Sequence, residues 1–155
     1  MNIVIAADPF ALELKDAVKK YLKEQGHTLI DVGADGDREV PYYDAAAAAC
    51  TLIQAGKAER GVLFCGTGMG MSIVANKFKG VIASCVESVF AARMARVIND
   101  SNVLTMGAMI VAGWMANEMV DAWMNAKHTE GLDQFADFLR EAVQKVSELD
   151  ANHCS

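Results

Sequence analysis

Basic residues are scarce in this sequence. The 155 residues include 14 Lys and Arg against 20 Asp and Glu, which gives a net charge of -6 at pH 7. Proteins that bind nucleic acids or anionic membrane surfaces rely on clustered Lys and Arg, so this balance disfavours both kinds of partner. A small anionic ligand would have to be held by a few local groups.

Long apolar runs, paired cysteines and metal-ligand spacings are also missing. The longest stretch without charged residues, 101–117, contains polar residues and glycines, so it is too short and too mixed to cross a bilayer. The four cysteines form no C-x-x-C pair, which is typical of free thiols, and no metal site is expected. The amino terminus shows no signal-peptide pattern, which favours a cytoplasmic location.

Short apolar runs alternate along the chain with segments of helical periodicity, a pattern typical of α/β proteins. Strands are predicted at residues 2–7, 28–32, 61–65, 81–86 and 103–106. Helices are predicted at about residues 12–22, 42–55, 88–98, 113–125 and 132–149. We therefore expect one domain, residues 1–155, with a three-layer αβα, Rossmann-like fold around a doubly wound, five-stranded parallel sheet.

The segment from Gly61 to Lys77, GVLFCGTGMGMSIVANK, is the most informative part of the sequence. It predicts a strand that ends in Cys65, followed by a glycine-rich loop and a helix. Ligands of doubly wound sheets bind at the carboxyl ends of strands, which points to this loop and also to Asp8 and Glu87. Glycines let backbone N–H groups converge on negative charge, either a phosphate or an oxyanion that develops during a reaction.

Cys65 favours the developing oxyanion. Amide groups of the loop would stabilise its thiolate, which would then serve as nucleophile or general base. The alternative interpretation is a small buried residue at the end of a strand, and position alone does not separate the two. A dinucleotide site is disfavoured, because the spacing is G-x-G-x-G rather than G-x-G-x-x-G and the loop follows the third strand.

Three segments together resemble the family of type B ribose-5-phosphate isomerases and galactose-6-phosphate isomerases. They are CGTGMGMSIVANKFKGVIA, ADPFALELK and RVINDSNVLTMG, and the resemblance runs from about residue 2 to residue 125. Family enzymes interconvert aldoses and ketoses through a cis-enediolate without metal or cofactor. The resemblance implies that Cys65 is the general base and that Thr67 assists at a sugar oxygen.

The resemblance also implies a substrate-binding set. Asp8 would hold sugar hydroxyls, Tyr43 would line the pocket, and loop amides together with Asn99 would stabilise the enediolate. The remaining members of this predicted set are Gly66, Gly68, Met69, Gly70 and Ser72. Because family members are dimers or tetramers with shared active sites, a homodimer or homotetramer is expected, with the last helix, about residues 132–149, packed on a partner subunit.

The chain departs from the family pattern at polar positions. Pro9 and Ile98 stand where the family has histidines, and the histidine at the second position is credited with opening the sugar ring. Met109, Leu132 and Ala136 stand where the family has arginines that bind phosphate. The substrate is therefore expected to be a short or open-chain sugar, such as a tetrulose phosphate, rather than ribose 5-phosphate.

Other cations would have to bind any substrate phosphate. Arg38, Arg96 and Arg140 are the candidates, although an ordinary solvated surface charge is the favoured interpretation of each. Two alternatives to a sugar-phosphate isomerase stay open: an isomerase of an acidic sugar without phosphate, and a non-catalytic sugar-binding subunit.

Overall fold

The computed structural model describes residues 1–153 and shows a five-stranded parallel sheet. Its strand order is β2-β1-β3-β5-β4. The strands are β1 (Asn2–Ala7), β2 (Thr28–Asp31), β3 (Arg60–Cys65), β4 (Ala83–Cys85) and β5 (Val103–Gly107). The α/β class, the Rossmann-like architecture and the five strands predicted from the sequence are confirmed.

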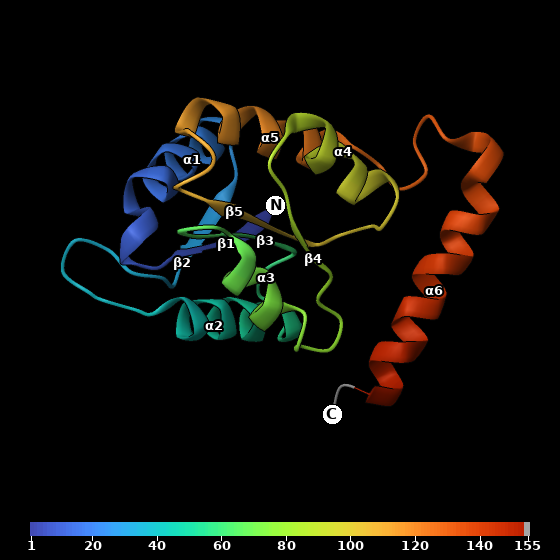
Figure 1. Cartoon of the computed structure of the whole chain (residues 1–155), viewed down its shortest axis with the longest axis horizontal. Coiled ribbons are helices and arrows are strands. Elements are labelled where there is room, and N and C mark those ends of the chain that lie inside the picture. The colour runs from blue at the N-terminus through green and yellow to red at the C-terminus, as the bar shows by residue number, and fades with distance from the viewer. Residues whose placement is uncertain (154–155) are drawn as a thin grey trace.

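Helices cover both faces of the sheet (Figure 1). The helices on one face are α1 (Leu12–Glu24), α4 (Val89–Val97) and α5 (Gly113–Asn125), and those on the other are α2 (Tyr42–Gln54) and α3 (Met69–Ala75). Two short 3-10 helices, η1 (Pro9–Ala11) and η2 (Asp133–Phe135), precede α1 and the last helix, α6 (Ala136–His153). The chain therefore has a separate apolar core on each side of the sheet.

The first helix shows how the sequence specifies these layers. Leu14, Val18 and Leu22 recur at intervals of four residues and are buried against the sheet. Lys15, on the neighbouring face, is also buried, with its ammonium group paired with Asp31 at the end of β2. The buried cation is tolerated because the carboxylate compensates its charge.

Strand β4 is shorter than the sequence predicts. The expected strand spans residues 81–86, but regular pairing begins only at Ala83. The N–H of Ile82 donates to Oδ1 of Asn102 at 2.8 Å, and the N–H of Ala83 donates to Oδ1 of Asn76 at 2.9 Å. The Asn102 side chain thus takes the donor of Ile82, which a longer strand would include, and hydropathy does not reveal such competition.

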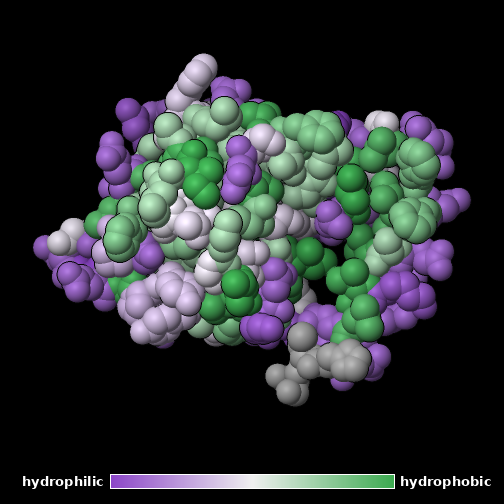
Figure 2. All heavy atoms as spheres, in the orientation of Figure 1, coloured by the Kyte–Doolittle hydropathy of each residue, from purple (hydrophilic) through white to green (hydrophobic). Residues whose placement is uncertain are grey.

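Helix α6 stands apart from the sheet (Figure 1). It runs to His153, beyond the predicted end near residue 149, and its side toward the body is largely apolar (Figure 2). Leu139 is buried, but Phe138, Val146 and Leu149 are 67%, 48% and 58% exposed. A hollow of about 460 Å³ lies between the end of α6 and the segment 80–82, and Asp150 Oδ2 accepts from the N–H of Gly80 beside it at 2.6 Å. This face of the helix is incompletely covered within one chain.

The cysteines and helices give two further observations. Cys50, Cys65 and Cys85 are free thiols, and Cys154 lies outside the described residues. Among residues 1–153, no helix combines the length and apolar character needed to cross a membrane. Within the same range, no cluster of three or more His, Cys, Asp or Glu side chains is arranged to hold a metal ion.

Candidate active site

Cys65 is the last residue of β3, and its side chain turns back toward the loop that follows. The thiol is 5% exposed, and the N–H of Gly68 donates to its Sγ atom at 3.1 Å. The thiol of Cys65 is therefore held against the backbone of the loop at Gly68. One loop amide, that of Gly68, contacts the thiol, and the role of the other loop amides stays a prediction.

Gly68 has the backbone shape that this contact requires. Its φ is +78°, in the left-handed region, and a Cβ at this position would lie 2.8 Å from the carbonyl carbon of Met106. Only glycine fits both the conformation and the space. The glycine pattern read from the sequence therefore has a direct structural reason at this residue.

The connection after β5 holds the glycine loop in place. The N–H groups of Ala108 and Met109 donate to the carbonyls of Cys65 and Gly66 at 2.9 and 3.0 Å. A Cβ on Gly107 would lie 2.5 Å from Thr67, so the two backbones touch here. Sequence reasoning did not single out Gly107, and its position directly after an apolar strand was the signal available.

Asp8 follows β1, the neighbour of β3. Its backbone N–H donates to the carbonyl of Phe64 at 3.1 Å, and its Oδ1 accepts from the N–H of Phe10 at 3.0 Å. Burial raises the pKa of the Asp8 carboxyl, although hydrogen bonds from Phe10 and Ala11 oppose that shift. The strand order reverses between β1 and β3, so Asp8 and Cys65 flank the place where doubly wound sheets bind ligands.

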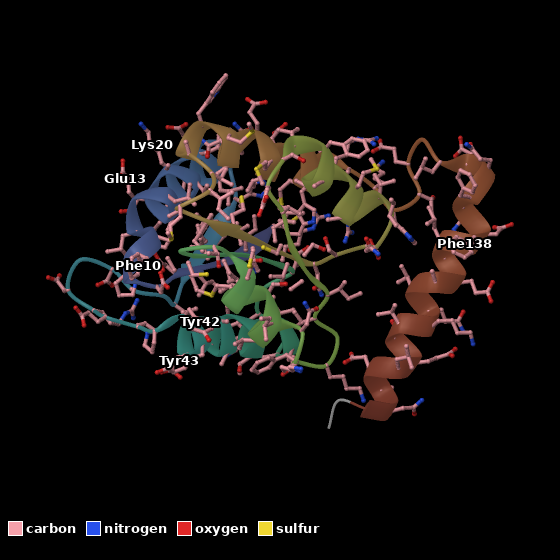
Figure 3. All side chains as sticks on the ribbon, in the orientation of Figure 1. Phe10, Glu13, Lys20, Tyr42, Tyr43 and Phe138 are labelled. Atoms are coloured by element: carbon pink, nitrogen blue, oxygen red, sulfur yellow. The ribbon has the colours of Figure 1, made fainter. Side chains whose placement is uncertain are left out.

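Two tyrosines lie beside the loop, at the opposite end of the molecule from Phe138 (Figure 3). The ring of Tyr42 lies so close to Gly70 that a Cβ there would approach it to 2.8 Å. Tyr43, which the resemblance assigned to the pocket, is 52% exposed and meets Tyr42 edge to face, with ring centroids 5.3 Å apart. Tyr42 was missed because the phase of the helix decides which neighbour faces the loop.

The other loop residues divide between exposed and structural positions. Thr67 Oγ1 accepts from the N–H of Met69 at 3.4 Å, and the Met69 side chain is half-exposed. Ser72 Oγ donates to the carbonyl of Ala83 at 3.5 Å, which links α3 to β4. Cys85, which sequence reasoning had not considered for the site, places its Sγ 3.7 Å from the carbonyl oxygen of Thr67.

Asn99 lies at the edge of the sheet formed by the amino ends of the strands, opposite the edge formed by their carboxyl ends, where Cys65 lies. It follows α4, beside Leu139 of α6, near where the carbonyl of Asn102 accepts from the N–H of Gly61 at the start of β3. A strand rises about 3.3 Å per residue, so the part of β3 between Gly61 and Cys65 alone spans about 13 Å. One protomer does not bring Asn99 to the thiol.

The three candidate arginines occupy different surroundings. Arg96 pairs with Asp100 at 2.9 Å and donates to two carbonyls before β5, and Arg140 is exposed on α6 beside Asp137. Both are remote from Cys65 within the protomer, whereas Arg38 lies at the same edge as Cys65. Of the three, Arg38 alone lies in a connection that follows the carboxyl end of a strand, and its contacts are with Gly33 and Asp35.

The geometry of the site can be compared with known proteins. The family model of the ribose/galactose isomerases matches residues 3–147. The chain belongs to this family. Such an isomerase interconverts an aldose and a ketose, and the match covers the loop, Asp8 and Asn99 alike.

Individual relatives agree with the family match. The isomerase is 44% identical over 152 residues to 4-deoxy-4-sulfo-D-erythrose isomerase of Clostridium sp. (strain MSTE9), covering 97% of this chain and 96% of the relative. It is 38% identical over 132 residues to D-erythrulose-4-phosphate isomerase of Pectobacterium atrosepticum, covering 84% and 87%. Ribose-5-phosphate isomerase B of Clostridium thermocellum has the same fold, with a TM-score of 0.89, 33% identity and 99% coverage of both chains.

Proposed function

We propose that this isomerase acts on a short, open-chain sugar that carries an acidic group at its far end, with Cys65 as the base. The hydrogen bond from the Gly68 N–H to the Cys65 sulfur, beside the buried Asp8, is the observation that carries this proposal. It joins a group able to take a proton from carbon to donors able to stabilise the resulting oxyanion.

The reaction moves one proton between adjacent carbons. The Cys65 thiolate takes the proton from the carbon next to the carbonyl, which leaves an enediolate held by loop N–H groups from Gly66 to Gly70. The resulting thiol returns a proton to the neighbouring carbon. The hydroxyl oxygen on the deprotonated carbon loses its proton and the former carbonyl oxygen gains one, a transfer that Thr67 would assist, so atoms and charge balance.

A four-carbon substrate fits the residue at the ring-opening position. Ile98 offers no acid or base there, and a tetrulose with a substituted fourth carbon has no hydroxyl with which to close a ring. The names of two relatives, a sulfo-erythrose isomerase and an erythrulose-4-phosphate isomerase, describe four-carbon sugars with acidic ends. These observations favour such a sugar over ribose 5-phosphate.

A second copy of the chain would complete the site. Asn99, which the resemblance assigns to the enediolate, lies at the far edge of its own sheet, next to the apolar face of α6. If two copies pack with that face against the glycine-loop edge of the partner, Asn99 of one approaches Cys65 of the other. The exposed apolar side chains of α6 supply area for this contact.

Solvent-proton exchange tests the proposal. Candidate tetroses, pentoses, uronates and their acidic derivatives are incubated with the protein in heavy water, and deuterium at the carbons adjacent to the carbonyl is followed by NMR. We expect exchange fastest for a four-carbon sugar with an acidic end. Exchange confined to ribose 5-phosphate would contradict the substrate, and no exchange with any sugar would favour a non-catalytic subunit.

A further inference from the structure

The peptide bond between Thr67 and Gly68 lies between two sulfur atoms. On one side, the N–H of Gly68 donates to Sγ of Cys65 at 3.1 Å. On the other side, Sγ of Cys85, the last residue of β4, lies 3.7 Å from the carbonyl oxygen of Thr67, a contact suited to a weak S–H donor. The N–H and the carbonyl of a trans peptide point in opposite directions, so the two contacts hold one peptide group from both sides.

The strand register explains how Cys85 reaches the loop. Strand β5 lies between β3 and β4, with Gly107 paired to Cys65 and Thr105 paired to Cys85. Paired residues of neighbouring strands and alternate residues of one strand share a face of the sheet, so both cysteines and Thr105 project to the same face. Gly107 has no side chain there, and the Thr67 backbone fills the space, 2.5 Å from where a Cβ would lie. The loop peptide therefore lies in the gap between the two cysteines.

Thr105 places a buried hydroxyl beneath this contact. Its side chain is fully buried, and its Oγ1 atom has no hydrogen-bond partner of regular geometry within the described chain, residues 1–153. Its pairing with Cys85 in the register sets this hydroxyl beside the thiol. A buried hydroxyl without a partner is unfavourable, and a neighbouring sulfur is a weak acceptor for it.

The Cys85 thiol keeps its proton at neutral pH. Part of the side chain is exposed, yet burial of the rest raises the pKa of the thiol, against the opposing effect of the Thr105 hydroxyl and with a further contribution from the charge of Glu87. A protonated thiol is able to donate, whereas a thiolate only accepts. At the carbonyl of Thr67, the sulfur is therefore the donor.

The orientation of this peptide matters for the proposed reaction. Gly68 accepts either sign of φ, so the residue itself offers little resistance to a flip of the peptide that precedes it. The flipped peptide would present the carbonyl oxygen of Thr67 to Cys65 in place of the N–H. An oxygen there would repel the negative charge of an enediolate, whereas an N–H stabilises it. Only one of the two orientations is compatible with an anion hole.

We propose that Cys85 is a positioning residue of the active site, whose S–H holds the Thr67 carbonyl and thereby keeps the Gly68 N–H directed at Cys65. The proposal rests on the proposed function, since it takes Cys65 to be the base. A hydrogen bond accepted by the carbonyl also polarises the peptide, and such coupling strengthens the N–H as a donor by about 10–30%. Cys85 touches no reacting atom in this scheme and acts only through the peptide.

Kinetics of two variants give the first test, with the sugar that exchanges fastest as substrate. Cys85→Ala removes the donor and is expected to lower kcat about 3- to 10-fold at a nearly constant KM, as expected for the loss of one hydrogen bond that acts in the transition state. Cys85→Asn supplies an N–H donor of longer reach than the sulfur and is expected to keep kcat near that of the unaltered protein. Ser84→Ala is the matched control, because Ser84 precedes Cys85 in β4 and projects to the opposite face, so its kcat should not change.

NMR spectra of the protein without substrate give the second test. Thr67 and Gly68 form the only Thr–Gly pair in the sequence, so labelling threonine carbonyls with carbon-13 and glycine with nitrogen-15 yields a single correlation across this peptide. Cys85→Ala is expected to shift this correlation and to speed exchange of the Gly68 amide proton with solvent about 3- to 10-fold. Cys85→Asn and Ser84→Ala should keep the slow exchange. A residue that served only overall stability would not act on this one peptide.

Three results would overturn the proposal. They are an unchanged correlation in Cys85→Ala, a shifted correlation with unchanged kcat, and slow Gly68 exchange in Cys85→Asn without recovery of kcat. In each case isomerisation by the unaltered protein would still support the proposed function. Isomerisation that survives in Cys65→Ser would reject Cys65 as the base, and the role of Cys85 with it.

Discussion

The two edges of the sheet differ in how complete they are. At the carboxyl edge, Cys65, Asp8 and the glycine loop are tied to one another through backbone hydrogen bonds and close glycine contacts. At the other edge, Asn99 lies beside hollows that flank α6, whose apolar side chains remain exposed. In the proposed mechanism the carboxyl edge holds the base and the anion hole, and the other edge holds groups that would act only in the site of a partner subunit.

This contrast separates what one chain builds from what an assembly would add. The carboxyl edge owes its geometry to local turns and to neighbouring strands of the same sheet, so a single chain suffices to form it. The far edge presents Asn99 and an uncovered helix, which a second copy would use. Substitutions at the carboxyl edge should therefore impair the active site of the same subunit, and substitutions at the other edge should impair the active site of the partner subunit.

The largest expected effect at the carboxyl edge follows removal of the thiol. Cys65→Ser should lower kcat about 100- to 10,000-fold, the range typical for loss of a general base, because a hydroxyl is far less acidic than a thiol. Its thermal unfolding should hardly change, since the two side chains are close in size. Steady-state kinetics and thermal melting measure both effects.

Cys50→Ala provides the matched control. Burial raises the pKa of the Cys50 thiol to about 12, so this cysteine is inert and far less ionised than a catalytic base must be. Its removal should preserve kcat and lower the free energy of unfolding by about 1 kcal/mol through loss of core volume. Equal loss of kcat in both variants would show that Cys65 is only a core residue.

The next effect concerns the backbone of the loop. Gly68→Ala should lower the free energy of unfolding by about 2–4 kcal/mol, since it adds a left-handed alanine and a clash with the backbone of Met106. Gly26→Ala is the control, because Gly26 has φ +83° but open space around its Cβ position, and should cost only about 1–2 kcal/mol.

Urea unfolding and kcat would be measured for both glycine variants. We expect Gly68→Ala to lower kcat about tenfold or more as the N–H moves away from the sulfur, and Gly26→Ala to keep it. Equal free energies of unfolding in the two variants would show that the close approach between Gly68 and the Met106 backbone adds nothing to the cost of the substitution.

Much of the carboxyl edge could be predicted from the sequence, because local patterns determine it. The apolar run before Cys65 and the spacing of Gly66, Gly68 and Gly70 predict a strand and a turn without knowledge of the rest of the fold. The contact between Tyr42 and Gly70 and that between Gly107 and Thr67 depend on which elements become neighbours in space. A single sequence carries little information about such pairs.

The far edge was predicted less well for a different reason. Asn99 matches the family pattern and follows a predicted helix, which in a parallel α/β sheet places it at the amino ends of the strands, away from Cys65. The sequence does not say how the two residues could serve one site. Arg96 looks like a free cation in the sequence, whereas its guanidinium group is occupied by Asp100 and two backbone carbonyls. Partners of this kind come from tertiary packing and are visible only in the fold.

The smallest expected effect is on the stability of the Asp8 variant. Burial raises the pKa of this carboxyl, so the native state is penalised for carrying its charge at any pH above the ordinary value of 3.8. Asp8→Asn keeps an oxygen to accept from Phe10 and should slightly raise stability at pH 7. The gain should vanish below pH 3.8, where both folded and unfolded states bind the proton.

Activity should move in the opposite direction in this variant. We expect Asp8→Asn to lower kcat/KM about tenfold, because an amide binds sugar hydroxyls less strongly than a carboxylate does. Urea unfolding at pH 3 and pH 7, with kinetics at pH 7, gives both quantities. A loss of stability at pH 7 would contradict the conclusion that burial of the Asp8 carboxylate destabilises the native state.

Complementation between inactive variants tests most directly whether the two edges meet across subunits. Cys65→Ser and Asn99→Ala are each expected to be nearly inactive. When the two variants are mixed, unfolded and refolded together, some dimers contain one chain of each. Such a hybrid has one intact site, made of Cys65 from one chain and Asn99 from the other. The account predicts recovery of about a quarter of the unaltered activity, since half of the dimers are hybrids and each has one working site of two. Activity no greater than that of the two variants assayed separately would contradict it.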